Sequence, residues 1–275
     1  MNKVVISDGS PAAPDEAALQ LERSYWESYQ DYDWSSDQAK TQAIACIPRL
    51  DGDILELCVG GGAFARKVPR GYRSYTGLDL SQSLLSALKA HMPHVHTVHG
   101  DAQNLPFGGA THDAVLVFSG LHHLPRFRKT LTDAFRILRP GGCFFCFEPN
   151  DRAWYRAPMR FLRSKKFVRD FIEIYSEDET YLDPVEVGQA FRDAGFTGIR
   201  VDFMTPRFNP GFLGFANRMF ANMIYLAAAM GNSARTQSYF AMSGRKHDDA
   251  GETRSGAAVV TDQTVNFVNS PSRIR

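Results

Sequence analysis

The stretch ILELCVGGGAFARKV, residues 54–68, decides the fold of this chain. It begins as an apolar strand that contains one carboxylate, passes through three consecutive glycines, and continues in a helical pattern. Glycines between a strand and a helix allow backbone N–H groups to approach a ligand closely. The stretch therefore predicts a βα unit whose glycine turn holds a nucleotide, either by a phosphate or by the ribose of an adenosyl group.

Strands and helical patterns alternate along the middle of the chain. We expect helices at residues 81–91 and 126–138, the second ended by the sequence Arg139-Pro140-Gly141-Gly142. A βαβ series of this kind predicts an α/β fold with a mostly parallel sheet, helices on both faces, and a ligand site at the carboxyl ends of the strands. The expected strands are residues 53–58, 74–79, 95–98, 113–119, 143–148, 199–204 and 237–246.

Composition excludes several functional classes. The chain has 275 residues, of which 44% are hydrophobic and 22% charged, and its net charge of +1 gives no indication of a nucleic-acid partner. Residues 1–20 lack the long apolar core of a signal peptide, and no apolar run reaches the roughly 18 residues of a membrane span. We expect a cytoplasmic protein.

The cysteines and histidines indicate no metal site. Cys143 and Cys146 have C-x-x-C spacing, but they lie in an expected strand, where residues three apart point to opposite faces. The histidines of residues 91–99 have no carboxylate or cysteine at ligand spacing. We therefore interpret the cysteines as buried thiols of a reducing compartment.

Four segments lie outside the alternating series. An aromatic-rich stretch at residues 15–34 predicts a helix ahead of the first strand, within an N-terminal segment of residues 1–39. The main domain is expected at residues 40–246, with insertions at 151–180 and 205–236. Residues 247–275 are rich in Gly, Ser, Thr and Asp without periodicity, which predicts a disordered tail.

The glycine turn allows two cofactors. Residues 60–65 satisfy G-x-G-x-x-A, and Asp79 ends the next strand, as in a nicotinamide-dependent oxidoreductase that binds NAD(P). Glu56 argues for a different ligand, because a carboxylate before the turn suits a sulfonium and ammonium cation better than a pyrophosphate. Asp101, after the third strand, can accept a hydrogen bond from an adenine amino group.

Taken in order, Glu56, the glycine turn, Asp79, Asp101 and the Leu138–Gly142 helix end resemble the class I S-adenosylmethionine-dependent methyltransferases, and in particular their small-molecule, quinone-pathway branch. The resemblance covers residues 40–148 closely and the strands up to 246 loosely. It implies a Rossmann-like, doubly wound, mostly parallel seven-stranded sheet and S-adenosyl-L-methionine as cofactor. A catalytically silent cofactor-binding subunit stays open as an alternative.

The resemblance also implies roles for single residues. Glu56, Gly60 and Gly62 would form the loop on the methionine side. Asp79 would bind the ribose hydroxyls, and Asp101 with Ala102 would hold the adenine. Ser119 would be a further cofactor-binding residue. Asp79 and Asp101 have a second interpretation as caps of the following helices. Cys58 departs from the pattern, because a glycine is usual at its position, and its side chain would crowd the ligand.

The chemistry is expected in the sequence SGLHHLP, residues 119–125, which follows the fourth strand. Methyl transfer is an in-line displacement at an activated sulfonium carbon, so the main task of the enzyme is to position the acceptor in a dry pocket. If the acceptor is a hydroxyl, a neutral imidazole can take its proton. His123, and after it His122, are the candidates, and a structural role for both is the alternative.

The insertions carry the clues to the acceptor. Apolar residues recur through 212–230, and with the insertion at 151–180 and the aromatic stretch 25–34 they predict a lid over a small, hydrophobic acceptor. Core packing or a homodimer interface is the alternative for residues 212–230. Basic residues near 160–169 form a solvated face in the simplest interpretation; the functional alternative is that they attract an anionic acceptor or a membrane surface, with peripheral membrane association. The lid candidates are Tyr25, Tyr29, Phe215, Met219 and Met223.

Overall fold

The structure is a computed structural model that describes residues 37–156, 182–205, 215–231 and 233–247. The expected N-terminal helix, most of the insertion at 151–180 and nearly all of the expected tail lie outside these residues. So do Tyr25 and Tyr29 of the predicted lid.

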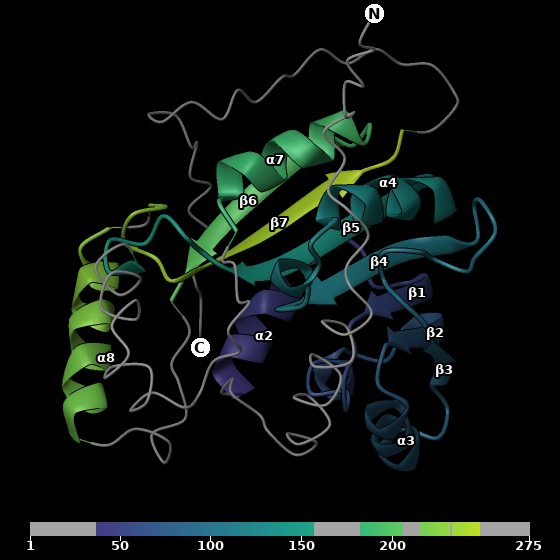
Figure 1. Ribbon diagram of the computed structural model, residues 1–275, viewed down its shortest axis with the longest axis horizontal. Coiled ribbons are helices and arrows are strands. Elements are labelled where there is room, and N and C mark those ends of the chain that lie inside the picture. Colours follow the sequence, from purple (N-terminus) through teal and green to yellow (C-terminus); the bar gives the residue numbers. More distant parts are fainter. Residues whose placement is uncertain (1–36, 157–181, 206–214, 232, 248–275) are drawn as a thin grey trace, which may run out of the picture.

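A seven-stranded sheet forms the centre of the molecule, in the order β3-β2-β1-β4-β5-β7-β6 (Figure 1). Strands β1 to β5 run parallel to one another, while β7 pairs antiparallel with β5 and β6. This confirms the predicted mostly parallel, seven-stranded sheet. The strands are β1 Gly52–Leu57, β2 Tyr72–Asp79, β3 His96–His99, β4 His112–Phe118, β5 Leu138–Pro149, β6 Thr197–Met204 and β7 Tyr239–Arg245.

Helices cover both faces of this sheet because its strands are apolar on both sides. Side chains of α4 and α7 pack with Leu55 and Leu57 in one cluster, whereas those of α2 and α3 pack with Ile54 in another. Cys146 belongs to the first cluster and Cys143 to the second, so the two thiols do lie on opposite faces. The helices are α2 Asp37–Ala45, α3 Gln82–His91, α4 Phe127–Ile137, α7 Pro184–Asp193 and α8 Phe215–Ala229.

Two local predictions are wrong. After the glycine turn the chain forms only the short 3-10 helix η1, Ala65–Lys67, because Pro69 disfavours helical conformation at the residue before it. The predicted end of the helix is confirmed, since α4 ends at Ile137, but β5 begins at Leu138 and not at the expected residue 143. Gly141 donates its N–H to the Lys246 carbonyl, and Gly142 accepts from the Lys246 N–H, which pairs this segment with the chain after β7.

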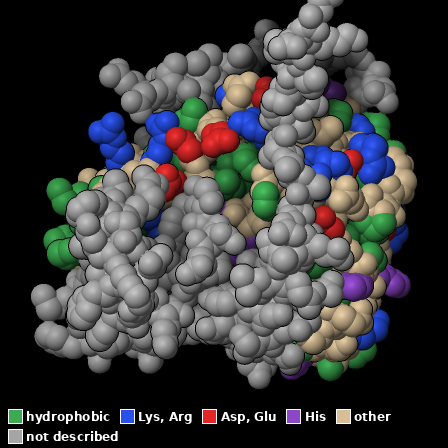
Figure 2. Space-filling model, viewed as in Figure 1, with side chains coloured by type: hydrophobic (Ala, Val, Ile, Leu, Met, Phe, Trp, Pro, Cys, Tyr) green, Lys and Arg blue, Asp and Glu red, His purple; other side chains and the backbone are tan. Residues whose placement is uncertain are grey.

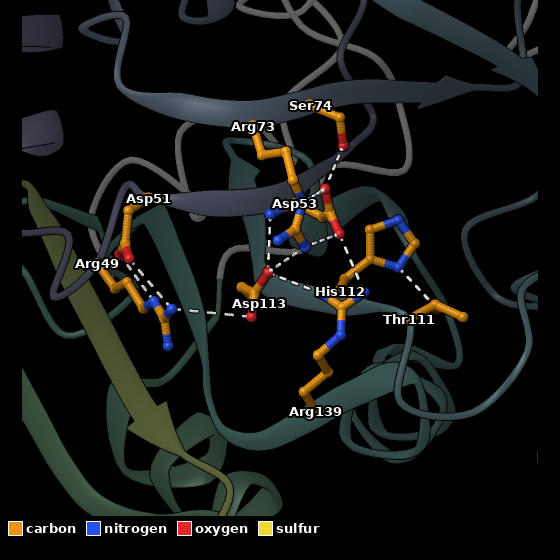
Figure 3. A network of polar contacts seen from close by, with 9 residues as sticks. All are labelled: Arg49, Asp51, Asp53, Arg73, Ser74, Thr111, His112, Asp113 and Arg139. Atoms are coloured by element: carbon orange, nitrogen blue, oxygen red, sulfur yellow. Dashed lines mark hydrogen bonds and ion pairs between the residues drawn. The ribbon is translucent and has the colours of Figure 1, made fainter.

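An ion-pair network ties the amino ends of four adjacent strands together (Figure 3). Each strand contributes its second residue, which is Arg73 in β2, Asp53 in β1, Asp113 in β4 and Arg139 in β5. The Asp113 carboxylate accepts hydrogen bonds from the Asp53 N–H at 2.8 Å and from Arg139 at 2.7 Å. Arg73 donates to Asp53 and holds the pKa of that carboxyl well below its usual range. Asp113 therefore stabilises the amino-terminal ends of these strands, opposite to the carboxyl ends where the ligand site is expected.

Charges of both signs mix on the described surface. Figure 2 shows acidic and basic side chains interspersed over the uncovered part of one face, in line with the net charge of +1. Among the described residues, no helix is long and apolar enough to cross a bilayer.

Candidate functional site

The candidate site lies where the strand order reverses. β1 has β2 on one side and β4 on the other, so the connections after β1 and after β4 leave the sheet in different directions. Ligands of open α/β sheets bind at such a switch point, outside the carboxyl ends of the strands. The segments that leave these ends are Cys58–Gly62, Asp79–Ser81, Gly100–Asn104, Ser119–His123 and Glu148–Asn150.

The glycines of the first turn have different functions. Gly60 has φ +53°, and a Cβ atom placed on it would meet nothing within 4 Å, so a ligand can approach the backbone there. Gly62 has φ +82°, and a Cβ atom on it would lie 2.5 Å from the side chain of Leu88 in α3. Gly60 therefore lines an open space, while Gly62 permits close packing of the turn against α3.

Asp79 fastens the end of β2 to this turn. Its carboxylate accepts the Gly60 N–H at 2.8 Å and the Ser81 N–H at 2.9 Å. The expected alternative, that Asp79 caps the next helix, is wrong, because Ser81 is the N-cap of α3 and accepts from the Leu84 N–H. Burial raises the pKa of the Asp79 carboxyl, and these two N–H groups partly offset the rise.

Asp101 organises the turn after β3. Its side chain accepts the Gln103 N–H at 2.8 Å and side-chain N–H groups of Gln103 and Asn104, both at 3.3 Å. No helix starts there, so Asp101 does not cap one. Ala102 is buried next to it in the core. Gln103 in turn accepts the Arg126 N–H at 3.0 Å, which connects this turn to the segment before α4.

Glu56 is buried within β1 and accepts a hydrogen bond from the Tyr75 hydroxyl of β2. Burial raises the pKa of the Glu56 carboxyl to about 8, although the Tyr75 hydrogen bond opposes the rise. Glu56 is thus mostly protonated at neutral pH until a cation approaches, because a nearby positive charge favours the carboxylate.

Cys58 has a left-handed backbone, with φ +54°, which is a conformation that favours glycine. Its side chain fits because Gly120, across the switch point, has none. A Cβ atom on Gly120 would lie only 2.6 Å from the Cys58 Cβ. The departure from the family pattern at Cys58 is therefore accommodated within the structure by a glycine on the neighbouring loop.

The site is acidic, and it contains an unsatisfied polar atom. Burial raises the pKa of the Cys58 thiol, and Asp79, Glu148, Asp101 and Glu56 raise it further in that order. Carboxyl groups from four strand ends thus act on one point, where those that are ionised favour a cationic ligand. The buried Ser119 hydroxyl oxygen has no hydrogen-bond partner in the described structure. The residues present therefore fit a bound nucleoside with a positive charge.

Glu148 is a site residue that the sequence did not reveal. It lies near the end of β5, is fully buried, and accepts the N–H groups of Gly120 at 3.1 Å and Leu121 at 2.8 Å. Its second oxygen lies 2.7 Å from Nδ1 of His122. The His122 ring is buried and its centroid lies 4.0 Å from that of His123. The one sequence signal for Glu148 was its position as an acidic residue near the end of the apolar stretch FFCFEP.

The predicted lid is described only in part. In α8, Ile224 is buried against Ala153 and Tyr155, which follow β5. Figure 1 places α8 on the side of the sheet where β4 and β5 end. Met223 is 50% exposed and Leu226 67% exposed, so these side chains are not core residues of the single chain. The side chains of Phe215 and Met219 lie outside the described residues.

Metal ligation finds no support in the described part of the chain, where no group of three or more His, Cys, Asp or Glu side chains is placed to hold an ion. The histidines of the 91–99 stretch have local roles instead. His91 contacts the Ala87 carbonyl, His94 the Tyr72 hydroxyl, and His99 the Leu80 carbonyl.

Comparisons with known proteins agree with this geometry. Residues 55–146 match a family model described as a methyltransferase domain. A demethylmenaquinone methyltransferase of Staphylococcus aureus is 30% identical over 60% of this chain and 76% of its own length. A phthiotriol/phenolphthiotriol dimycocerosates methyltransferase of Mycobacterium tuberculosis is 41% identical over 33% of this chain and 35% of its own.

Similarity of structure extends over more of the chain. A S-adenosylmethionine-dependent methyltransferase of Thermotoga maritima superposes with a TM-score of 0.56 at 18% identity. The superposition covers 82% of this chain and 94% of the other. At this level of identity the likeness concerns the fold.

Proposed function

Because this chain belongs to the S-adenosylmethionine-dependent methyltransferases, we propose that it methylates a lipophilic acceptor that carries an ionisable hydroxyl, at the carboxyl ends of β1, β2 and β4. The position of Asp79 carries the proposal, because its carboxylate at the end of β2 accepts the Gly60 N–H at 2.8 Å, beside the open space in front of Gly60 where a ligand can approach the backbone. Membership of this family also decides against the nicotinamide alternative.

S-adenosylmethionine, when bound, supplies a methyl group on a positively charged sulfur that leaves as a neutral thioether. The residues of this chain hold it. Asp79 receives the ribose hydroxyls on the lone pairs that its two backbone partners do not use. Asp101 and Ala102 bind the adenine, and Gly60 lets the backbone come close. Glu56 faces the positive end, and the Ser119 hydroxyl gains the partner that it lacks.

The acceptor side is formed by the turn after β4. His122 or His123 takes the proton from the acceptor hydroxyl, which activates the oxygen, or a ring carbon conjugated with it, for attack on the methyl carbon. A base is useful here because a phenolic or quinol oxygen is a far better nucleophile once it is deprotonated. The buried surroundings of His122 keep water away from the reacting atoms.

The class of acceptor is inferred from two observations. The relatives are methyltransferases of demethylmenaquinone and of phthiotriol or phenolphthiotriol dimycocerosates. In this chain, α8 exposes Met223 and Leu226, and Met230 follows with 82% exposure. We infer that the enzyme is cytoplasmic, and that this apolar surface of α8 meets a membrane and receives a lipophilic acceptor from it. A homodimer that buries the same helix is the competing arrangement.

Two measurements test the proposal. Calorimetry with S-adenosylmethionine, S-adenosylhomocysteine and NAD should give binding of the first two only. Turnover with reduced demethylmenaquinone as the probe acceptor, followed by S-adenosylhomocysteine release, separates an enzyme from a silent subunit. Met223→Asp should raise the KM for the probe and leave S-adenosylhomocysteine binding unchanged. Loss of a dimer on a sizing column with unchanged KM would assign α8 to an interface instead.

A further inference from the structure

The environment of Glu148 is unlike that of an ordinary buried carboxylate. One oxygen accepts two consecutive backbone N–H groups, those of Gly120 and Leu121, and the other faces Nδ1 of His122 at 2.7 Å. All three partners belong to the short turn that follows β4, which contains the 3-10 helix η2, Leu121–His123. A single side chain of β5 therefore fixes both the backbone and one ring of this turn.

We propose that Glu148 is a positioning residue for methyl transfer, which holds His122 in the tautomer that carries its proton on Nδ1 and accepts a proton on Nε2. The inference rests on the proposed function, because it assigns a role to the turn that faces the acceptor. A carboxylate that receives two N–H groups on one oxygen offers only acceptor positions on the other. Nδ1 must then donate, and Nε2 becomes the basic nitrogen.

The proton and electrons balance in the resulting step. The acceptor O–H bond breaks and its proton moves to Nε2 of His122, while the oxygen, or in a quinol the ring carbon that carries its negative charge, forms a bond to the methyl carbon. In the quinol, the ring carbon then loses its own proton and the oxygen regains one. The S–CH3 bond breaks, and its electron pair stays on the sulfur, which becomes neutral. The positive charge lost from the sulfur is gained by the imidazole, next to the Glu148 carboxylate. That carboxylate stabilises the imidazolium, as expected for a charge-assisted hydrogen bond.

Titration supports the geometry. Burial raises the pKa of the Glu148 carboxyl to about 7, while the Leu121 and Gly120 N–H groups and the charge of His123 oppose the rise. Among the described residues, the thiols of Cys58 and Cys146 also interact with this carboxyl, and their pKa values are raised well above their usual range. These thiols stay neutral, so the ionisation of Glu148 near pH 7 sets the charge next to His122. Above it, the pair can act as a base.

Glu148→Gln is the decisive variant because it is nearly isosteric. The Gln carbonyl can still accept the two backbone N–H groups, but its amide group donates to Nδ1 and forces the proton of His122 onto Nε2. Imidazole nitrogen NMR on the full chain, with the His122 signals assigned by their loss in His122→Gln, reports the tautomer. We expect the Nδ1–H form in the wild type above pH 7 and the Nε2–H form in the variant.

Kinetics and binding separate this inference from the proposed function. With reduced demethylmenaquinone as probe, Glu148→Gln should lower kcat about a hundredfold, within the range of general-base catalysis, and remove the rise of rate near pH 7. Binding of S-adenosylhomocysteine should weaken far less than kcat falls, since its sulfur is neutral and the Gln carbonyl still anchors the turn. A His122 tautomer that is identical in both proteins overturns the inference. Absence of S-adenosylhomocysteine binding by the wild type overturns the proposed function instead.

Discussion

Replacing Asp79 by alanine tests the donor site most sharply. The substitution removes the acceptor for the ribose hydroxyls, and with it a charge-assisted hydrogen bond worth about 1.5 to 3 kcal/mol. It also leaves the N–H groups of Gly60 and Ser81, now at 2.8 and 2.9 Å from the carboxylate, without their partner. We expect the Kd for S-adenosylhomocysteine in calorimetry to rise about tenfold to a hundredfold.

The control is Asp202→Ala, which removes the same charge from an exposed position on the edge strand β6. It should leave the Kd unchanged. Asp79→Asn, which keeps one acceptor oxygen, serves if the alanine variant does not fold, and it should weaken binding less. Equal affinity of the wild type and both Asp79 variants would refute the assignment of this carboxylate. An equal loss in Asp202→Ala would show that overall charge, and not the ribose contact, decides binding.

Three further predictions concern stability and the acceptor. In urea denaturation, the wild type should lose stability as the pH rises from about 4.5 to about 8, by at most about 1.4 kcal/mol per pH unit, because the folded protein retains the Glu56 proton over this range. Glu56→Gln keeps an acceptor for the Tyr75 hydroxyl but has no such proton, so its stability should depend less on pH. Gly120→Ala places a Cβ atom 2.6 Å from that of Cys58 and should cost about 1 to 3 kcal/mol in the same assay. Cys58→Gly, but not Cys58→Ala, should recover most of that loss, and failure of this rescue would contradict the pairing of the two positions. Met223→Asp should abolish liposome cosedimentation if the apolar surface of α8 meets the membrane. Binding that survives in this variant removes α8 from that role.

Local patterns predicted the architecture well, because each strand of a doubly wound sheet is an apolar run that can be recognised in isolation. The strands β1, β2, β4 and β5 all begin or end within a few residues of the predicted bounds, apart from the early start of β5 at Leu138. That start depends on pairing with Lys246, more than a hundred residues away, which no local pattern reveals. The missing helix after Gly62 reflects Pro69, whose effect outweighed the apolar pattern.

The donor side of the site was predictable for a similar reason, since glycines and strand-end carboxylates mark the positions where the chain leaves the sheet. The connection between Glu148 and the turn of His122 was not. It joins residues 26 positions apart, on strands that become neighbours only in the folded sheet. The same holds for Cys58 and Gly120, where one side chain fills the space that the other leaves. Tertiary contacts of this kind decide that His122 is the histidine whose ring contacts Glu148.

The central claim is that this chain transfers a methyl group from S-adenosylmethionine to a lipophilic acceptor, with the donor held by strand-end carboxylates. Incubation with S-adenosylmethionine carrying a labelled methyl group and a panel of lipophilic hydroxylated acceptors, including reduced demethylmenaquinone, measures it directly by mass spectrometry of the organic phase. The account predicts one labelled product for the wild type and a strongly reduced yield for Asp79→Ala. A wild type that binds S-adenosylhomocysteine yet labels no acceptor, or an Asp79→Ala variant with full yield at limiting donor, would contradict it.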